Sequence, residues 1–290
     1  NLKRHYLENY RKSYFNHWET FLSNFYQGQD IWTDRENKID LAYNLSNNNS
    51  PYNRVIRDAA IALEPILGPA QDAAQIPTWV NLLYRYIKLS GPADQNRTEK
   101  DGLIRKITDG SKSLFNKVAG KHIDVDNRRS EIQDPLDKEA IIYLNEYKES
   151  LGNMVRHLKT PQNAYQLVRA VFDESNASTD TTAQSVNINA RALDKLKQKL
   201  GRGDTNEEVF WQLLSNQRNQ IWHVLLEEAQ VHIQHKWQNE VLAEETDLNG
   251  WELIDRLQGV DGAVWQFKKA ELTPFLQVNS ITGYKSRKLY

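Results

Sequence analysis

Residues 226–241, "LEEAQVHIQHKWQNEV", hold the side chains of this chain that are best suited to chemistry. Glu228, His232 and His235 are spaced so that one helix could present all three on neighbouring positions of one face. Carboxylate and imidazole groups bind zinc, and three such ligands with an open position for water make a hydrolytic site. The sequence therefore raises the hypothesis of a metal-dependent hydrolase, for instance one that acts on the cell wall.

The same spacing also fits a helix with no catalytic role. Glu228 and His232 form an i, i+4 pair, which on a helix surface is worth about 0.2–0.5 kcal/mol. An apolar stripe lies beside them at helical spacing: Trp222, Leu226, Ala229, Ile233 and Trp237. We expect this stripe to face the core and the Glu/His stripe to be solvated, so that replacing either histidine by alanine changes stability by less than about 0.5 kcal/mol. A fully buried Trp237 would instead cost about 3–5 kcal/mol on replacement by alanine.

Composition excludes several other classes of protein. The 37 basic and 38 acidic residues leave a formal net charge of −1, which argues against nucleic acid as the main partner. The chain has no cysteine, and this excludes disulfides, cysteine-based zinc sites and thiol nucleophiles. We find no nucleotide-binding or serine-hydrolase motif and expect no cofactor. Because the chain starts at Asn1 without a signal peptide, we expect it to be a piece of a longer protein.

Helical spacing of apolar residues runs through most of the chain. The first helix is expected to bury a stripe of six residues: Leu7, Tyr10, Tyr14, Trp18, Phe21 and Phe25. Ser50-Pro51 and Thr160-Pro161 are typical helix starts, with a capping residue followed by a first-turn proline. Gly201 is expected to end one helix, and Thr205 with Glu208 is expected to form a capping box for the next.

These patterns predict a mainly α protein, a multi-helix bundle with extended structure only near the C-terminus. The stretch "ESNASTDTTAQSVNINA" is low in apolar residues and is the best linker candidate. We therefore expect one helical subdomain over residues 1–175, a linker over 176–189 and a second helical subdomain over 190–290. The tetrapeptide "GRGD" (201–204) contains an adhesion tripeptide, but a helix cap and a turn are the simpler interpretation.

Five segments, in order along the chain, resemble segments of one known family. They are "YFNHWETFLSNF", "NLSNNNSPYNRVIRDAA", "DKEAIIYLNEYKESLGNM", "FWQLLSNQRNQIWHVLLEEAQVHIQHKWQNEV" and "LQGVDGAVWQFKKAELTPFL". They are similar to the IcmF/TssM family, the large inner-membrane subunit of the bacterial type VI secretion membrane complex. The signature residues that carry this resemblance are Trp18, Pro51, Trp211, Trp222, Trp237, Gly259, Gly262, Trp265, Phe267, Pro274 and Phe275.

The resemblance covers nearly the whole chain and implies a structural role without catalysis. The chain would be a periplasmic scaffold segment of an inner-membrane protein, and the membrane spans would lie upstream. Its partners would be other copies of itself and other subunits of the complex. An outer-membrane lipoprotein would bind through a β-rich module that begins after residue 290. We expect the signature aromatic residues to be core and Gly259 and Gly262 to form turns.

Overall fold

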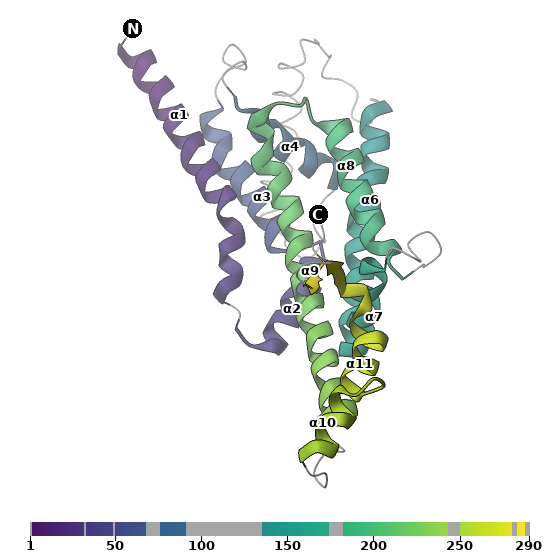
Figure 1. The fold of residues 1–290 in the computed structure, drawn as a ribbon. Helices are drawn as coiled ribbons and strands as arrows, with labels where there is room; N and C mark the ends of the chain where they lie inside the picture. The colour runs from purple at the N-terminus through teal and green to yellow at the C-terminus, as the bar shows by residue number, and fades with distance from the viewer. Residues whose placement is uncertain are drawn as a thin grey trace. The chain divides into compact units, whose positions relative to one another are not determined.

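The computed structural model describes most of the chain. The described residues are 2–31, 33–48, 50–67, 76–90, 135–173, 182–242, 250–279 and 283–287. Over these ranges the protein is mainly α-helical, which confirms the predicted fold class, and its strands form one two-stranded antiparallel ribbon near the C-terminus (Figure 1). Within these ranges, no helix is both long and apolar enough to cross a membrane.

The backbone contacts divide the chain into two compact units that are each discontinuous in sequence. Unit 1 comprises residues 1–152 and 188–220, and unit 2 comprises residues 153–187 and 221–290. This division differs from the consecutive subdomains expected over 1–175 and 190–290. Of the linker expected over 176–189, residues 184–189 are the first turns of a helix, and residues 174–181 lie outside the described residues.

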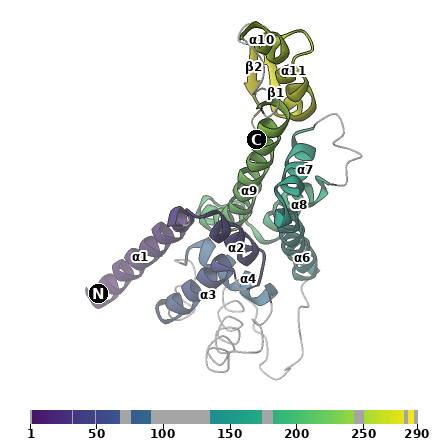
Figure 2. The ribbon, with the colours of Figure 1, turned by 90° about the horizontal axis from the view of Figure 1, so that it is seen from below.

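Helices make up the described part of unit 1. Its elements are α1 (Leu2–Ser23), a 3-10 segment (Phe25–Ile31), α2 (Arg35–Leu45), α3 (Pro51–Leu63), a 3-10 turn (Glu64–Ile66), α4 (Thr78–Ser90), most of α6 (Pro135–Val155), most of α8 (Gln184–Leu200), a second 3-10 turn (Thr205–Glu207) and the first part of α9 (Glu208–Trp237). Helices α3 and α4 pack side by side, and α2 adjoins α3 (Figures 1 and 2).

Unit 2 gathers short elements around the end of α9. They are a 3-10 turn (Arg156–Lys159), α7 (Pro161–Phe172), a π-helical turn (Gln238–Leu242), α10 (Gly250–Gln258), α11 (Ala263–Phe267), a second π-helical turn (Lys268–Leu272), a 3-10 turn (Thr273–Phe275), β1 (Leu276–Asn279) and β2 (Gly283–Ser286). Leu276 pairs with Ser286 and Asn279 with Gly283. Gly283 has φ +76°, a conformation that glycine adopts without strain. Figure 2 shows α10, α11 and the ribbon grouped together.

Side-chain capping starts the helices at the predicted residues in two of three cases. The Ser50 hydroxyl accepts a hydrogen bond from the backbone N–H of Asn53 at 3.1 Å, and the Thr160 hydroxyl accepts one from Asn163 at 3.2 Å. Both caps are followed by proline, as predicted. The capping box expected at Thr205 is wrong, because the side chain of Asp204 caps this turn instead.

The N-terminal helix buries a different face from the one predicted. Leu7, Tyr10 and Phe21 are exposed, whereas Phe15 and Leu22 are buried. The predicted stripe is therefore wrong for these three residues, because α1 meets the rest of unit 1 through the neighbouring face that carries Phe15 and Leu22, about 100° away around the helix. Near its N-terminus α1 extends away from α3, and its outer aromatic residues pack mainly on one another (Figure 1).

A buried polar junction connects several segments of unit 1. The Tyr147 hydroxyl of α6 donates to the backbone oxygen of Leu214 at 2.7 Å and lies 3.3 Å from Gln217 Oε1, both on α9. Gln217 Nε2 in turn donates to the Leu45 backbone oxygen at 2.5 Å and lies 3.4 Å from Ser50 Oγ. One amide therefore satisfies the end of α2, the cap of α3 and the tyrosine of α6.

We expect Tyr147→Phe to lower the free energy of unfolding by about 1–3 kcal/mol, because it leaves the buried oxygens of Leu214 and Gln217 with one donor fewer. Tyr6→Phe on exposed α1 is the matched control and should stay within about 0.5 kcal/mol of wild type. Urea denaturation of the three proteins measures both differences. Equal stabilities for the two variants would contradict a stabilising role for the junction.

Candidate functional site

The Glu/His face of α9 is partly internal, contrary to our expectation that it is solvated. Glu228 is only 2% exposed and His232 is half-buried, while His235 is exposed. The buried residues over this part of the helix are Ile221, Val224, Leu225, Glu228 and Ala229. Of the stripe expected to face the core, only Ala229 is buried, and the other four residues are half-buried. The buried face is thus rotated by about 100°, or one residue, from the predicted one.

Three segments of unit 2 bring five polar or charged residues together into what we term the Glu271 cluster. Its members are Tyr165 and Arg169 of α7, His232 and Lys236 of α9, and Glu271 of the second π-helical turn. The Tyr165 hydroxyl donates to the Glu271 backbone oxygen at 3.0 Å and accepts from Arg169 Nη1 at 3.3 Å. Lys236 Nζ lies 2.6 Å from Glu271 Oε1, and the rings of His232 and Tyr165 pack with centroids 4.8 Å apart.

The protonation states of the cluster follow from burial and from its ion pair. Burial alone would raise the pKa of Glu271, but the hydrogen bonds and charges of Lys236, Tyr165 and Arg169 outweigh it and lower the pKa. The hydrogen bond to Glu271 raises the pKa of Lys236. Desolvation lowers the pKa of His232 below its ordinary value. At neutral pH the cluster therefore holds a charged lysine and carboxylate beside a neutral imidazole.

The three candidate zinc ligands are not assembled into a ligand set. Within the part of the chain that the structure describes, no group of three or more His, Asp or Glu side chains is placed to hold a metal ion. His232 packs on Tyr165, and His235 lies 3.2 Å from the amide of Asn239, one helical turn away. The pattern Glu228–His232–His235 thus marks a partly buried helix face.

Four of the five members of the Glu271 cluster were not among the site residues predicted from the sequence: Tyr165, Arg169, Lys236 and Glu271. Lys236 could have been found, because it lies four residues after His232 and eight after Glu228 on the same face. Glu271 had no such signal, since it is 35 residues from its lysine partner. Pairing across that separation depends on how the chain turns back after α11.

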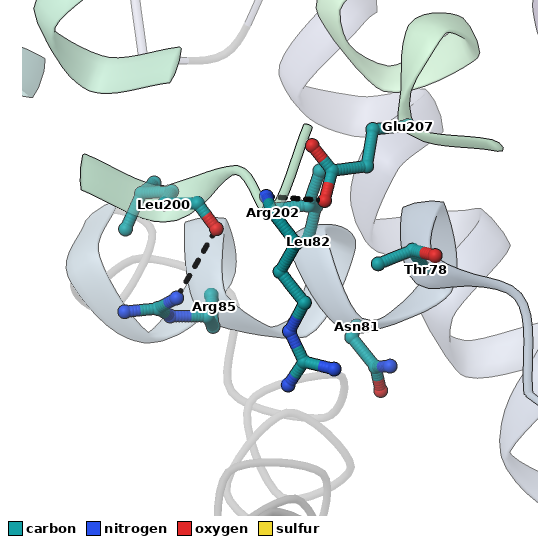
Figure 3. Close-up of a pocket in the computed structure, with 7 residues that line it drawn as sticks. All are labelled: Thr78, Asn81, Leu82, Arg85, Leu200, Arg202 and Glu207. Atoms are coloured by element: carbon teal, nitrogen blue, oxygen red, sulfur yellow. Dashed lines mark hydrogen bonds between the residues drawn. The ribbon is translucent and has the colours of Figure 1, made fainter. Parts of the chain in front are cut away.

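A small pocket in unit 1 lies between α4 and the loop that follows α8. It is lined by Thr78, Asn81, Leu82, Arg85, Leu200, Arg202 and Glu207 (Figure 3). Arg85 Nη1 donates to the Leu200 backbone oxygen at 3.2 Å, and Glu207 Oε1 accepts from the backbone N–H of Arg202 at 2.6 Å. Glu207 is 2% exposed, and its other oxygen lies 3.5 Å from the indole nitrogen of Trp211. The Glu207 carboxylate of this pocket therefore binds the backbone of the loop that carries Arg202.

The Arg-Gly-Asp tripeptide in the same loop is a turn and a cap, as the simpler interpretation predicts. Gly203 has φ +77°, which favours glycine. The Asp204 carboxylate accepts from the Thr78 hydroxyl at 2.6 Å and from the backbone N–H of Asn206 at 3.1 Å. Gly201 follows the last residue of α8 and donates its N–H to the Lys197 backbone oxygen at 2.8 Å, which confirms the predicted helix end. The carboxylate that an adhesion motif would present is thus engaged within the fold.

The signature residues divide into buried, half-buried and exposed positions. Trp211, Gly262 and Phe267 are buried; Trp18, Pro51, Trp222, Trp237, Gly259, Pro274 and Phe275 are half-buried; Trp265 is exposed. Trp237 and Phe267 meet edge to face with centroids 5.2 Å apart, so the fourth and fifth sequence segments pack together here. The indole of Trp265 donates to the Gln258 backbone oxygen at 3.2 Å. Of the signature aromatic residues, Trp211 and Phe267 are therefore core, as expected. Trp265 is not, and its indole belongs to the turn after α10.

The two signature glycines lie where the backbone leaves no room for a side chain. A Cβ at Gly259 would be 2.3 Å from the Asp255 backbone oxygen, and one at Gly262 would be 2.4 Å from the Leu257 backbone oxygen. Gly259 follows the last residue of α10, and Gly262 precedes the first residue of α11. Both glycines therefore serve the turn between these two helices.

In comparisons with known proteins, no family model, curated protein or solved structure matches this chain. A family for the chain thus stays an inference from the motifs in its sequence.

Because His232 packs on Tyr165, our expectation that His232→Ala is neutral has to be revised. We now expect it to lower the free energy of unfolding by about 1–2 kcal/mol, whereas exposed His235→Ala should stay within about 0.5 kcal/mol. The pKa of His232 is lowered in the fold, so the unfolded chain takes up a proton first as the pH falls through about 6.5. Wild type should therefore lose stability as the pH falls from roughly 7.5 to roughly 5. Part of that loss should disappear in His232→Ala.

Denaturant melts of both alanine variants at the two pH values measure these effects. The interpretation is wrong if both variants have the same stability and the same pH dependence.

Removing Lys236 tests the ion pair of the Glu271 cluster. Lys236→Met keeps the aliphatic stem but leaves a nearly buried carboxylate without its cation, and we expect a loss of about 1–3 kcal/mol. Lys269→Met, at an exposed position of the same π-helical turn as Glu271, is the control and should be nearly neutral. Adding Glu271→Gln to Lys236→Met should recover part of the loss in thermal melts. No recovery in the double variant would show that charge is not the cause.

Proposed function

We propose that this chain is a structural scaffold segment of an IcmF/TssM-like protein in the membrane complex of a type VI secretion system. Its role would be to span part of the periplasm and to hold other proteins of the complex. The observation that carries the proposal is the order of five sequence segments similar to that family, with Trp18, Pro51, Trp211, Trp237 and Phe267 among their signature residues. The mainly helical fold is compatible with such a role.

Contacts between the segments in unit 1 support the proposal. Gln217, in the fourth segment, donates to the backbone of Leu45 in the second, and Tyr147 of the third bonds to the fourth. Phe25, which ends the first segment, packs edge to face on Tyr52 of the second with ring centroids 5.1 Å apart. A set of motifs that pack on one another is expected if they define one fold, because a scaffold is specified by its packing residues.

A contact within unit 2 supports the proposal in the same way. Trp237 of the fourth segment packs on Phe267 of the fifth, and Lys236 pairs with Glu271 in the same two segments. These residues have partners inside the fold. Packing can therefore explain why one face of α9 carries Glu, His and Lys side chains. No specific observation favours the metal-dependent hydrolase over this scaffold role.

The partners we propose follow from the resemblance. They are other copies of the protein and other subunits of the secretion membrane complex. An outer-membrane lipoprotein would bind to a β-rich module beyond residue 290, so none of its contact residues is assigned here.

The absence of cysteine from the 290 residues makes a topology test direct. Asn145→Cys and Gln234→Cys introduce exposed thiols in α6 and α9, and Leu196→Cys introduces a buried control thiol. In the protein as the bacterium makes it, a maleimide reagent that cannot cross the inner membrane should label the two exposed thiols in cells with a permeabilised outer membrane. The buried thiol should react only after denaturation.

The partner prediction is tested in the same cells. After cross-linking, the tagged protein should co-purify with other subunits of the type VI membrane complex. Labelling of Asn145→Cys and Gln234→Cys only after cell lysis would place this region in the cytoplasm and overturn the proposal. Correct labelling without any subunit of the complex would leave a periplasmic protein and exclude the scaffold role.

A further inference from the structure

We propose that α1 of one molecule binds the outer face of α10 of a second molecule, so that copies of this chain associate head to tail. The inference rests on the proposed scaffold role in one respect, namely that another copy of the protein is a partner. It adds the two surfaces that meet and the kind of assembly that they build. One surface belongs to unit 1 and the other to unit 2.

The first surface is an exposed stripe on α1, which we term the α1 stripe. Its members recur at helical spacing on one side of the helix: Tyr6, Leu7, Tyr10, Tyr14 and Phe21. All but the half-buried Tyr14 are exposed, whereas the neighbouring face of α1 is buried in unit 1 through Phe15 and Leu22. Tyr10 and Tyr14 stack with ring centroids 6.1 Å apart, which restrains both rings. An exposed aromatic stripe of this kind is typical of a protein interface.

The second surface is the outer face of α10, which consists of Trp251, Ile254 and, in the turn that follows, Val260. Helix α10 packs on α11, and its residues Leu253 and Leu257 are half-buried. Trp251 and Val260 are instead 84% and 97% exposed, and Ile254 is exposed as well. The apolar side of α10 is therefore only partly covered. Its uncovered part holds a tryptophan, a residue type that is enriched at the centres of interfaces.

The two surfaces carry opposite charge. Residues 2–12 hold four basic residues and one acidic residue, a formal charge of +3: Lys3, Arg4, Arg11 and Lys12 against Glu8. Residues 250–262 hold three acidic residues and one basic residue, a formal charge of −2: Glu252, Asp255 and Asp261 against Arg256. Two copies of either surface would repel each other. Charge thus favours the pairing of α1 with α10 over a symmetric pairing of like surfaces.

Helix geometry places one charge of each sign next to the apolar residues of its surface. Lys3 lies on the same side of α1 as Tyr10 and Phe21, and Asp255 lies one turn after Trp251 on α10. Both charged side chains are exposed. Lys12 is also exposed but lies on the opposite side of α1 from Tyr10 and Phe21. A direct contact between the two surfaces therefore depends on Lys3 and not on Lys12.

The pairing of unlike surfaces determines the assembly. Each molecule that uses its α1 still offers its α10 to another copy, so the contact does not stop at a dimer. Such a heterologous contact produces a ring if the rotation between copies closes and a filament if it does not. The proposed scaffold would thus be able to build a repeated structure from one type of contact.

The first test is sedimentation of the 290-residue chain over a range of protein concentrations. We expect the average mass of wild type to rise beyond that of a dimer and to fall when salt is added, because salt screens the opposite charges. Tyr10→Ser and Trp251→Ser should each raise the apparent Kd roughly tenfold or more. Val278→Ser, at an exposed apolar position on β1, should associate like wild type. Circular dichroism confirms that each variant is folded.

Mixing the two serine variants tests whether the contact is head to tail. Tyr10→Ser keeps an intact α10 and Trp251→Ser keeps an intact α1, so an equal mixture should form a dimer and stop there. Each variant alone should stay monomeric at the same concentration.

Charge reversal tests the same contact independently. Lys3→Glu should weaken association, Lys12→Glu should change it little, and adding Asp255→Lys to Lys3→Glu should restore it. The proposal is overturned if wild type is monomeric throughout, if Trp251→Ser associates like wild type, or if the mixture forms no dimer. A monomeric chain that nevertheless passes the labelling and co-purification tests would overturn this contact and leave the scaffold role in place.

Discussion

The side-chain amide of Gln217 is the interaction on which much of unit 1 depends. Its nitrogen donates to the last residue of α2, and its oxygen lies within reach of the Tyr147 hydroxyl of α6. An amide buried without partners would cost a few kcal/mol, so the helices that supply its partners have to meet at this point. Hydrogen bonds have stricter geometry than apolar contacts, so those of Gln217 help to fix how these helices pack.

In unit 2 the ion pair of Lys236 and Glu271 likewise fixes how distant segments pack. Glu271 is 6% exposed, and its carboxylate can be buried there because Lys236 pairs with it. The Tyr165 hydroxyl satisfies the backbone oxygen of the same residue. Breaking such a pair is costly even when its net contribution is small, since the remaining charge would be buried alone. The segment after α11 is therefore held against α9 and α7 by a contact with strict geometry. Phe275 of the same segment adds ring contacts with Tyr165 and Phe172.

The sequence predicted local features of the fold well and the orientation of helix faces less well. The caps at Ser50 and Thr160 and the helix end before Gly201 depend on neighbouring residues only, and the structure confirms them. The buried face of α1 could not be predicted in the same way. This helix carries aromatic residues around much of its circumference, so its neighbours decide which ones are covered. The wrong capping box has a related cause, because Asp204 has a better-placed acceptor than the threonine that follows it.

The α9 helix shows why the candidate site was harder to predict than the fold. Two stripes run along it, one with Trp222 and Trp237 and one with Glu228 and His232, and hydrophobicity alone favours burial of the first. Of the second stripe, Glu228 is nevertheless buried and His232 is half-buried, and polar groups on this side of the helix find partners in the fold, the ring of Tyr165 for His232 and Glu271 for the following Lys236. Those partners are distant in sequence, and a single sequence does not reveal their pairing. A Glu/His pattern on a helix is thus poor support for a metal site until the residues across from it are known, since the same groups satisfy one another in a packed interior.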